Sequence, residues 1–115
     1  MKTIIAGSRT ISSIQIVEQA ILESGFEITE VVSGKAKGVD TLGEVWAALH
    51  GVPVKGFPAN WDEHGKAAGY IRNIAMAHHA DALIAVWDGV SRGTGHMIEQ
   101  AKKKGIKVFV CRTLQ

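Results

Sequence analysis

The chain has 115 residues, of which 46% are hydrophobic and 21% are charged, and its formal net charge is +2. This composition is typical of a globular protein, and the length predicts a single domain over residues 1–115. No apolar run approaches the roughly 18 to 20 residues of a membrane span, so we expect no membrane partner. The small net charge argues against nucleic acid as a partner, because polyanion binders usually present a concentrated basic face. A lone Cys111 offers no intramolecular disulfide, and with Gly7 interrupting any signal-like start it favours a cytoplasmic location.

Five short segments rich in β-branched residues alternate with helical patterns. They cover residues 3–6, 28–33, 52–57, 82–87 and 106–111. Several are apolar at successive positions, as strands covered on both faces are. Strands that alternate with helices predict right-handed crossovers and a parallel sheet. The expected fold is therefore α/β, a Rossmann-like three-layer sandwich with a five-stranded parallel sheet.

The first and last helices carry start and stop signals. Ser12 and Gln15 have the spacing of a capping box, and Gly25 follows the first helix as its stop. The last helix is expected over residues 94–104, with Gly105 directly after it.

Two further helices are expected between these, over residues 39–50 and 66–79. Each has apolar residues at helical spacing, which predicts a face turned to the core. The residues expected on those faces are Leu42, Val45, Trp46 and Leu49 in the first of the two, and Ala67, Ile71, Ile74 and Ala75 in the second.

Glycines, cations and hydroxyl groups recur in the segments that follow the strands. In an open parallel sheet the ligand crevice lies beyond the carboxyl ends of the strands, where the strand order reverses. Glycine admits an anion close to the backbone, helix starts donate N–H groups, and Arg or Lys adds charge-assisted bonds. The candidate ligand-binding residues in these segments are Gly7, Ser8, Arg9, Ser33, Gly34, Lys35, Gly38, Asp40, Ser91, Arg92, Gly93 and Thr94.

Several candidates also have a structural interpretation. Asp40 either bonds a ribose hydroxyl or complements the dipole of the helix that it begins. Trp61 either stacks on a base or covers the sheet edge, and Arg72 either faces the cleft or is an ordinary surface arginine. Asp88 and Glu99 either supply acid–base chemistry or serve as helix and loop partners.

Other classes of site lack their sequence patterns. The five histidines do not form a His-x-x-x-His pair and do not join cysteines at zinc spacing, so we expect neither a metal nor a cofactor. No segment matches the phosphate loop of ATPases or the full dinucleotide fingerprint of dehydrogenases.

The motifs together resemble the YspA-like (DUF2493) branch of the SLOG superfamily. The similarity is carried by residues 7–9, 33–40, 46–47, 58–61, 68–73 and 93–94. It implies a Rossmann-like domain that binds nucleotides or nucleotide-derived signals, and it adds Asn73 to the expected binding residues, with Trp61 and Arg72.

A relative of that branch is the Lonely Guy type of phosphoribohydrolase, which cleaves the base from a nucleoside monophosphate. The similarity places its catalytic arginine on Arg72, whereas its motif glutamate falls on Met97. The next carboxylate, Glu99, is rotated by roughly 200° around the helix. If the chain is an enzyme, the resemblance implies N-glycosidic cleavage, with Arg72, Glu99 and Asp88 as the catalytic candidates.

We therefore expect binding of a nucleotide or nucleotide-derived signal, for sensing or sequestration, with phosphoribohydrolase activity and single-stranded nucleic-acid binding as alternatives. A homo-oligomer is also expected, because a shared site enlarges a pocket that a small domain can barely enclose.

Overall fold

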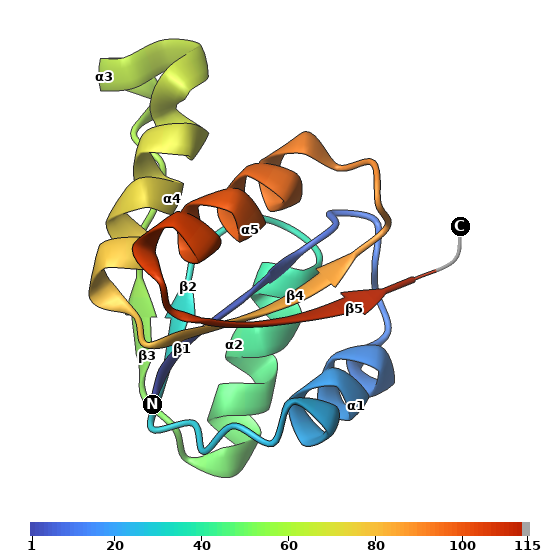
Figure 1. Cartoon of the computed structure of the whole chain (residues 1–115). Coiled ribbons are helices and arrows are strands. Elements are labelled where there is room, and N and C mark those ends of the chain that lie inside the picture. The colour runs from blue at the N-terminus through green and yellow to red at the C-terminus, as the bar shows by residue number, and fades with distance from the viewer. Residues whose placement is uncertain (114–115) are drawn as a thin grey trace.

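A computed structural model describes residues 1–113, and its elements follow the expected alternation of strands and helices (Figure 1). In chain order they are β1 (Lys2–Gly7), α1 (Ile14–Ser24), β2 (Glu30–Ser33), α2 (Val39–His50), β3 (Val54–Gly56), α3 (Trp61–His64), the 3₁₀ turn η1 (Gly65–Ala67), α4 (Ala68–His79), β4 (Ala82–Trp87), α5 (Arg92–Lys104) and β5 (Lys107–Arg112). Within the described residues, no helix combines the length and the apolar character needed to cross a membrane.

The five strands form one parallel sheet in the order β3-β2-β1-β4-β5. Helices α1 and α2 pack with one half of the core, and α4 and α5 pack with the other half on the opposite face (Figure 1). Successive residues of β1 divide between the two halves, since Ile4 belongs to the α4/α5 side and Ile5 to the α1/α2 side. The expected Rossmann-like three-layer sandwich is confirmed.

The strand order also fixes where a ligand crevice forms. From β1 the chain moves outward to β2 and β3, and it then returns to place β4 on the other side of β1. The loops that leave β1 and β4 therefore separate toward opposite faces of the sheet. This reversal point lies at the carboxyl ends of these two strands.

The start of α1 differs from the expected capping box. The helix begins at Ile14 after Ser13, so Gln15 is its second residue, too early for the reciprocal bond to Ser12. Instead, the Ser13 hydroxyl donates to Gln15 Oε1 at 3.1 Å. The predicted stop is confirmed, because Gly25 has a φ of 70° and its N–H donates to the Leu22 carbonyl.

The core face of α2 is rotated from the predicted one. Val39, Gly43 and Ala47 are buried, whereas Leu49 is 70% exposed. The reason is a close approach to β1: a Cβ atom at Gly43 would lie 2.9 Å from the Cβ of Ile5. Such close packing selects small side chains for the inward face. Of the predicted stripe, Leu42 and Trp46 only border the core and Val45 is exposed.

The predicted inward face of α4 is also wrong, since Ala67, Ile71, Ile74 and Ala75 are exposed. The helix buries Ala68, Asn73, Met76 and Ala77 instead. A polar side chain, Asn73, occupies the centre of this face because it is hydrogen-bonded to α5. A count of apolar residues therefore assigns the face incorrectly.

The expected homo-oligomer stays a prediction.

The close contact between α2 and β1 makes a stability prediction. Gly43→Ala normally favours a helix by up to about 1 kcal/mol. Here we expect the variant to lose about 1–3 kcal/mol of unfolding free energy, because its Cβ would collide with Ile5. Urea unfolding of both proteins measures the difference. Gly93→Ala in α5 is the matched control, since no atom of residues 1–113 lies within 4 Å of its added Cβ. Equal stability of Gly43→Ala and wild type would contradict the close approach.

Candidate functional site

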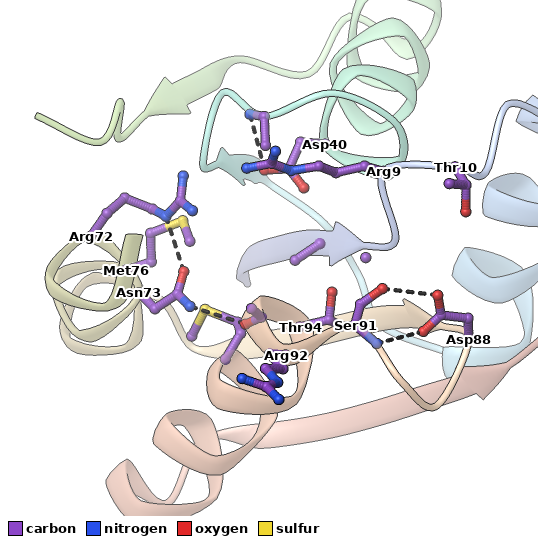
Figure 2. A pocket seen from close by; sticks show the side chains of 15 residues that line it. Arg9, Thr10, Asp40, Arg72, Asn73, Met76, Asp88, Ser91, Arg92 and Thr94 are labelled. Atoms are coloured by element: carbon purple, nitrogen blue, oxygen red, sulfur yellow. Dashed lines mark hydrogen bonds between the residues drawn. The ribbon is translucent and has the colours of Figure 1, made fainter. Parts of the chain in front are cut away.

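A cavity of about 340 Å³ lies at the carboxyl ends of β1 and β4, where the strand order reverses (Figure 2). The loops after β1 and β2, the inner face of α4 and the first turns of α5 enclose it. Its lining residues are Ala6, Gly7, Arg9, Thr10, Ala36, Asp40, Arg72, Asn73, Met76, Asp88, Ser91, Arg92, Gly93, Thr94 and Met97.

The end of β1 is confined between β4 and α2. A Cβ atom at Gly7 would lie 2.1 Å from the Val86 carbonyl oxygen and 2.8 Å from a methyl carbon of Val39. Only glycine fits between these groups. The next residue, Ser8, is buried, and its N–H donates to the same Val86 carbonyl at 3.1 Å. This glycine therefore brings the loop after β1 against the loop after β4.

Asp88 organises the loop between β4 and α5. One of its carboxylate oxygens accepts the N–H groups of Val90 and Ser91, each at 2.8 Å, and the other accepts the Ser91 hydroxyl at 2.9 Å. The N–H of Asp88 donates to the Ser8 hydroxyl oxygen at 3.1 Å. The backbone N–H group of Ser91, followed by that of Val90, lowers the pKa of the Asp88 carboxyl to about 2. Asp88 is therefore ionised at neutral pH and does not serve as a proton donor there.

Arg72 connects α4 to the loop after β2. Its Nη1 donates to the Gly34 carbonyl, and its Nε donates to Asn73 Oδ1 at 3.0 Å. Burial lowers the pKa of the Arg72 guanidinium, the nearby Asp40 carboxylate raises it, and Arg9 lowers it further. Arg9 and Arg72 therefore repel each other across the cavity, and Asp40 partly offsets that repulsion.

Asp40 is the buried acid of the cavity, with a residue exposure of 5%. Its Oδ2 accepts the Ala36 N–H at 3.3 Å. Burial raises the pKa of the Asp40 carboxyl, while the Ala36 N–H and Arg72 act in the opposite direction. Figure 2 shows the Arg9 side chain extending toward Asp40. Asp40 and its neighbours thus place a carboxyl group beside two guanidinium groups.

Asn73 joins α4 to the start of α5. Its amide Nδ2 donates to the Gly93 carbonyl and to His96 Nδ1, at 3.1 Å in each case. With Oδ1 accepting from Arg72, both ends of this buried amide are hydrogen-bonded. The side chain therefore fixes Arg72 and the first turn of α5 relative to each other.

The first turn of α5 supplies N–H donors to the cavity. The helix begins at Arg92 after Ser91, and its first backbone bond runs from the Gly95 N–H to the Ser91 carbonyl. The N–H groups of Arg92, Gly93 and Thr94 have no acceptor within the helix. All three residues line the cavity. Together with the positive end of the helix dipole, these groups favour an anion at this wall.

The structure brings together ten of the residues expected from the sequence: Gly7, Arg9, Asp40, Arg72, Asn73, Asp88, Ser91, Arg92, Gly93 and Thr94. Seven others lie outside the lining: Ser8, Ser33, Gly34, Lys35, Gly38, Trp61 and Glu99. Lys35 Nζ pairs with Glu44 at 2.9 Å, and Ser33 donates to the same carboxylate. Trp61 is half exposed and borders a separate shallow hollow formed by residues 58–62.

Gly34 and Gly38 shape the wall without lining it. A Cβ atom at Gly34 would lie 2.7 Å from Arg72 Nη1, and Gly38 has a φ of 77° with its Cα hydrogen facing Ser8 and Arg9. Substitution of either glycine would displace a cavity arginine. These two glycines of the loop after β2 are therefore required for steric reasons rather than for contact with a ligand.

Five lining residues were not expected from the sequence as ligand contacts. They are Ala6, Thr10, Ala36, Met76 and Met97. Met76 and Met97 are almost fully buried and give the cavity an apolar wall. Met97 occupies the position that corresponds to the hydrolase glutamate, whereas Glu99 is exposed and lies outside the cavity. A helical pattern cannot distinguish a methionine that borders a cavity from one inside a core.

The lowered pKa of Asp88 predicts a pH-dependent contribution to stability. The folded-state pKa of about 2 lies below the ordinary value of 3.8. The stabilisation is therefore complete above pH 3.8 and is lost as the pH falls toward 2. We expect Asp88→Asn to unfold at lower urea concentration than wild type at pH 7. The difference between the two urea midpoints should become small near pH 2. The exposed Glu99→Gln on α5 is the charge-matched control, and a gap that persists at pH 2 would contradict this assignment.

Comparisons with known proteins agree with the fold and locate the family. DNA processing protein A (DprA) from Streptococcus pneumoniae superposes with a TM-score of 0.77 at 23% sequence identity, over 95% of this chain and 49% of that one. The chain thus spans about half the length of that protein. The Gene 61 protein of Mycobacterium phage D29 is 40% identical over 87 residues, which are 69% of this chain and 68% of the phage protein.

The family model for the YspA, cpYpsA-related SLOG family matches residues 1–64. This range includes Gly7, Arg9, Gly34 and Asp40 but ends before α4 and α5, which supply Arg72, Asn73 and Arg92. The family resemblance seen in the sequence is thereby confirmed, and the chain belongs to the YspA, cpYpsA-related SLOG family.

Proposed function

We propose that this chain binds a nucleotide or a nucleotide-derived ligand in the cavity at the ends of β1 and β4. One observation carries the proposal: Arg9, Arg72 and Arg92 line the same cavity as the first turn of α5. Guanidinium groups and helix-start N–H groups are the donors that proteins use for phosphate. Two carboxylates, Asp40 and Asp88, oppose three guanidinium groups, so the lining carries net positive charge.

The polar and apolar parts of the cavity suit a ribose between the phosphate and the base. The Asp40 carboxyl can accept hydrogen bonds from ribose hydroxyls, while Met76 and Met97 offer an apolar wall to the sugar carbons. The volume of about 340 Å³ lies near the lower end of the roughly 300–1,000 Å³ range of small-molecule sites. This size supports a mononucleotide rather than a dinucleotide.

Sensing or sequestration agrees better with this lining than base cleavage does. The carboxylate expected on α5 for a phosphoribohydrolase is replaced by Met97, and Asp88 is held ionised by backbone N–H groups. One observation favours the enzyme nonetheless, because Asp40 is a buried carboxyl with a raised pKa inside the cavity. We therefore keep N-glycosidic cleavage as the second candidate, with Arg72 and Asp40 as its charged groups.

Single-stranded nucleic acid is the third class of ligand. A protein named for DNA processing shares the fold, and the cavity groups that suit a mononucleotide phosphate also suit a phosphate of a strand. The net charge of +2 supplies little of the long-range attraction that such binding needs. Binding of a single-stranded oligonucleotide is therefore measured as the competing outcome.

We expect a nucleoside 5′-monophosphate to raise the melting temperature of the wild-type protein, by an amount that corresponds to about 2.7 kcal/mol at a hundredfold excess over Kd. Arg9→Gln and Arg92→Gln, both at exposed residues, should each weaken the affinity about tenfold or more through loss of a charge-assisted bond. Lys104→Gln is the control for net charge, because Lys104 lies outside the cavity. Calorimetric titration with the four common monophosphates measures these affinities.

Equal affinity of Arg9→Gln, Arg92→Gln and wild type would overturn the binding site proposed here. Salt-dependent binding of a single-stranded oligonucleotide without mononucleotide binding would favour the third class instead.

We expect chromatography of the wild-type protein incubated with a nucleoside monophosphate to return the intact ligand. Release of free base above the rate in buffer would establish the hydrolase, and Asp40→Asn should then abolish that release. Because Asp40 is buried beside Arg72, the variant's melting temperature must be measured alongside.

A further inference from the structure

A partly exposed aromatic pair adjoins the cavity without belonging to its lining. The rings of Tyr70 on α4 and His96 on α5 have centroids 4.3 Å apart and an interplanar angle of 33°. Tyr70 is 45% exposed although its ring is already in contact with an aromatic neighbour. The pair lies over the line where α4 and α5 meet, and the lining described above gives it no role.

The pair is tied to the cavity through Asn73. The amide that donates to the Gly93 carbonyl, on the cavity wall, donates equally to His96 Nδ1 at 3.1 Å. A ring nitrogen that accepts this bond carries no proton, so the remaining proton of neutral His96 is on Nε2. Burial lowers the pKa of His96, which keeps the ring neutral at pH 7. The same contact that fixes the anion-binding turn therefore also fixes the orientation of this ring.

The distance along α5 from the cavity to His96 matches the distance between the phosphate and the base of a mononucleotide. Arg92 and Gly93 begin the helix at the cavity, and His96 follows Arg92 by four residues, or roughly 6 Å along the axis. A ribose separates the phosphate of a mononucleotide from its base by a comparable length. Tyr70 is likewise one helical turn before Asn73 on α4. Both rings thus lie one turn away from residues of the phosphate-binding wall.

We infer that the Tyr70–His96 pair is the base subsite: the phosphate and ribose occupy the cavity, and the base stacks on the exposed ring of Tyr70 beside His96. This inference rests on the proposed nucleotide binding and deepens it. Stacking on aromatic side chains tolerates any base, because every base presents a π face. His96 Nε2–H offers a hydrogen-bond donor beside the ring and favours a base that has an acceptor at its edge.

The test compares a ligand that has a base with one that lacks it. Adenosine 5′-monophosphate and ribose 5-phosphate are titrated into wild type, Tyr70→Leu, Tyr70→Phe and His96→Asn. The His96→Asn side chain keeps an oxygen near the position of Nδ1 for the Asn73 amide but removes the ring. Tyr70→Phe keeps the ring and removes only the hydroxyl, so it is the matched control.

We expect Tyr70→Leu to weaken adenosine 5′-monophosphate binding about tenfold and to leave ribose 5-phosphate binding unchanged. Tyr70→Phe should bind both ligands as wild type does, and His96→Asn should weaken only the nucleotide. In proton NMR spectra, the adenine H2 and H8 signals should shift upfield with wild type and not with Tyr70→Leu. A lower melting temperature of Tyr70→Leu, together with an equal loss of affinity for both ligands, would identify a merely structural role.

The outcomes separate the two proposals. If wild type binds both ligands and Tyr70→Leu changes the two affinities by the same factor, or changes neither, the base subsite is overturned while nucleotide binding stands. If wild type binds neither ligand, the cavity is not a nucleotide site and both proposals fail.

Discussion

The partly buried guanidinium group of Arg72, close enough to the Asp40 carboxylate for the two charges to interact, is the group on which the cavity depends. A charge removed from water is costly unless an opposite charge and hydrogen bonds compensate it. Arg72 meets this requirement through Asp40, the Gly34 carbonyl and Asn73 Oδ1, and Asp40 through Arg72 and the Ala36 N–H. Because Gly34 belongs to the loop after β2 and Arg72 to α4, the bond from Arg72 to the Gly34 carbonyl holds together segments that are far apart in the sequence.

The charges around Asp40 also set the sign of the cavity. Asp40 alone would repel a phosphate, but the positive charge of the nearby Arg72 partly offsets it. Arg9 and Arg92 then remain as exposed cations at the mouth, next to the N–H groups that begin α5. The arrangement attracts an anion while it keeps a carboxyl oxygen available for hydroxyl groups. A phosphorylated sugar offers both kinds of group in one molecule.

The packing of the sheet makes room for these groups at one place. Gly7 permits the end of β1 to pass between Val86 and Val39, and Gly43 permits α2 to lie against Ile5. The Gly7 contact brings the loop after β1 beside the loop after β4, where the Ser8 hydroxyl accepts the Asp88 N–H and is also hydrogen-bonded to the Ser91 hydroxyl. The hydroxyl of Ser8 is thereby used within the fold, which explains why a serine in the expected binding motif lies outside the cavity lining.

Local sequence patterns were sufficient to predict the alternation of strands and helices, the parallel sheet and the segments that end at the site. These features follow from local patterns: apolar strands, helix stops such as Gly25 and Gly105, and glycine next to cations at the strand ends. Arg9, Asp40 and Arg92 are accordingly predicted from these local patterns. The family resemblance contributed Arg72 and Asn73, whose bonds to other elements have no local signature.

Which side chains turn inward depends on contacts between elements that local patterns do not contain. The inward face of α2 depends on how closely it approaches β1, and that of α4 on the bond from Asn73 to Gly93. Neither distance is encoded in the helical period, so the larger apolar residues were assigned to the core incorrectly. For the same reason the sequence did not distinguish Lys35, which pairs with Glu44, from Arg9, which lines the cavity. Both are cations after a strand, and their roles differ because the fold supplies a carboxylate to one and an open cavity to the other.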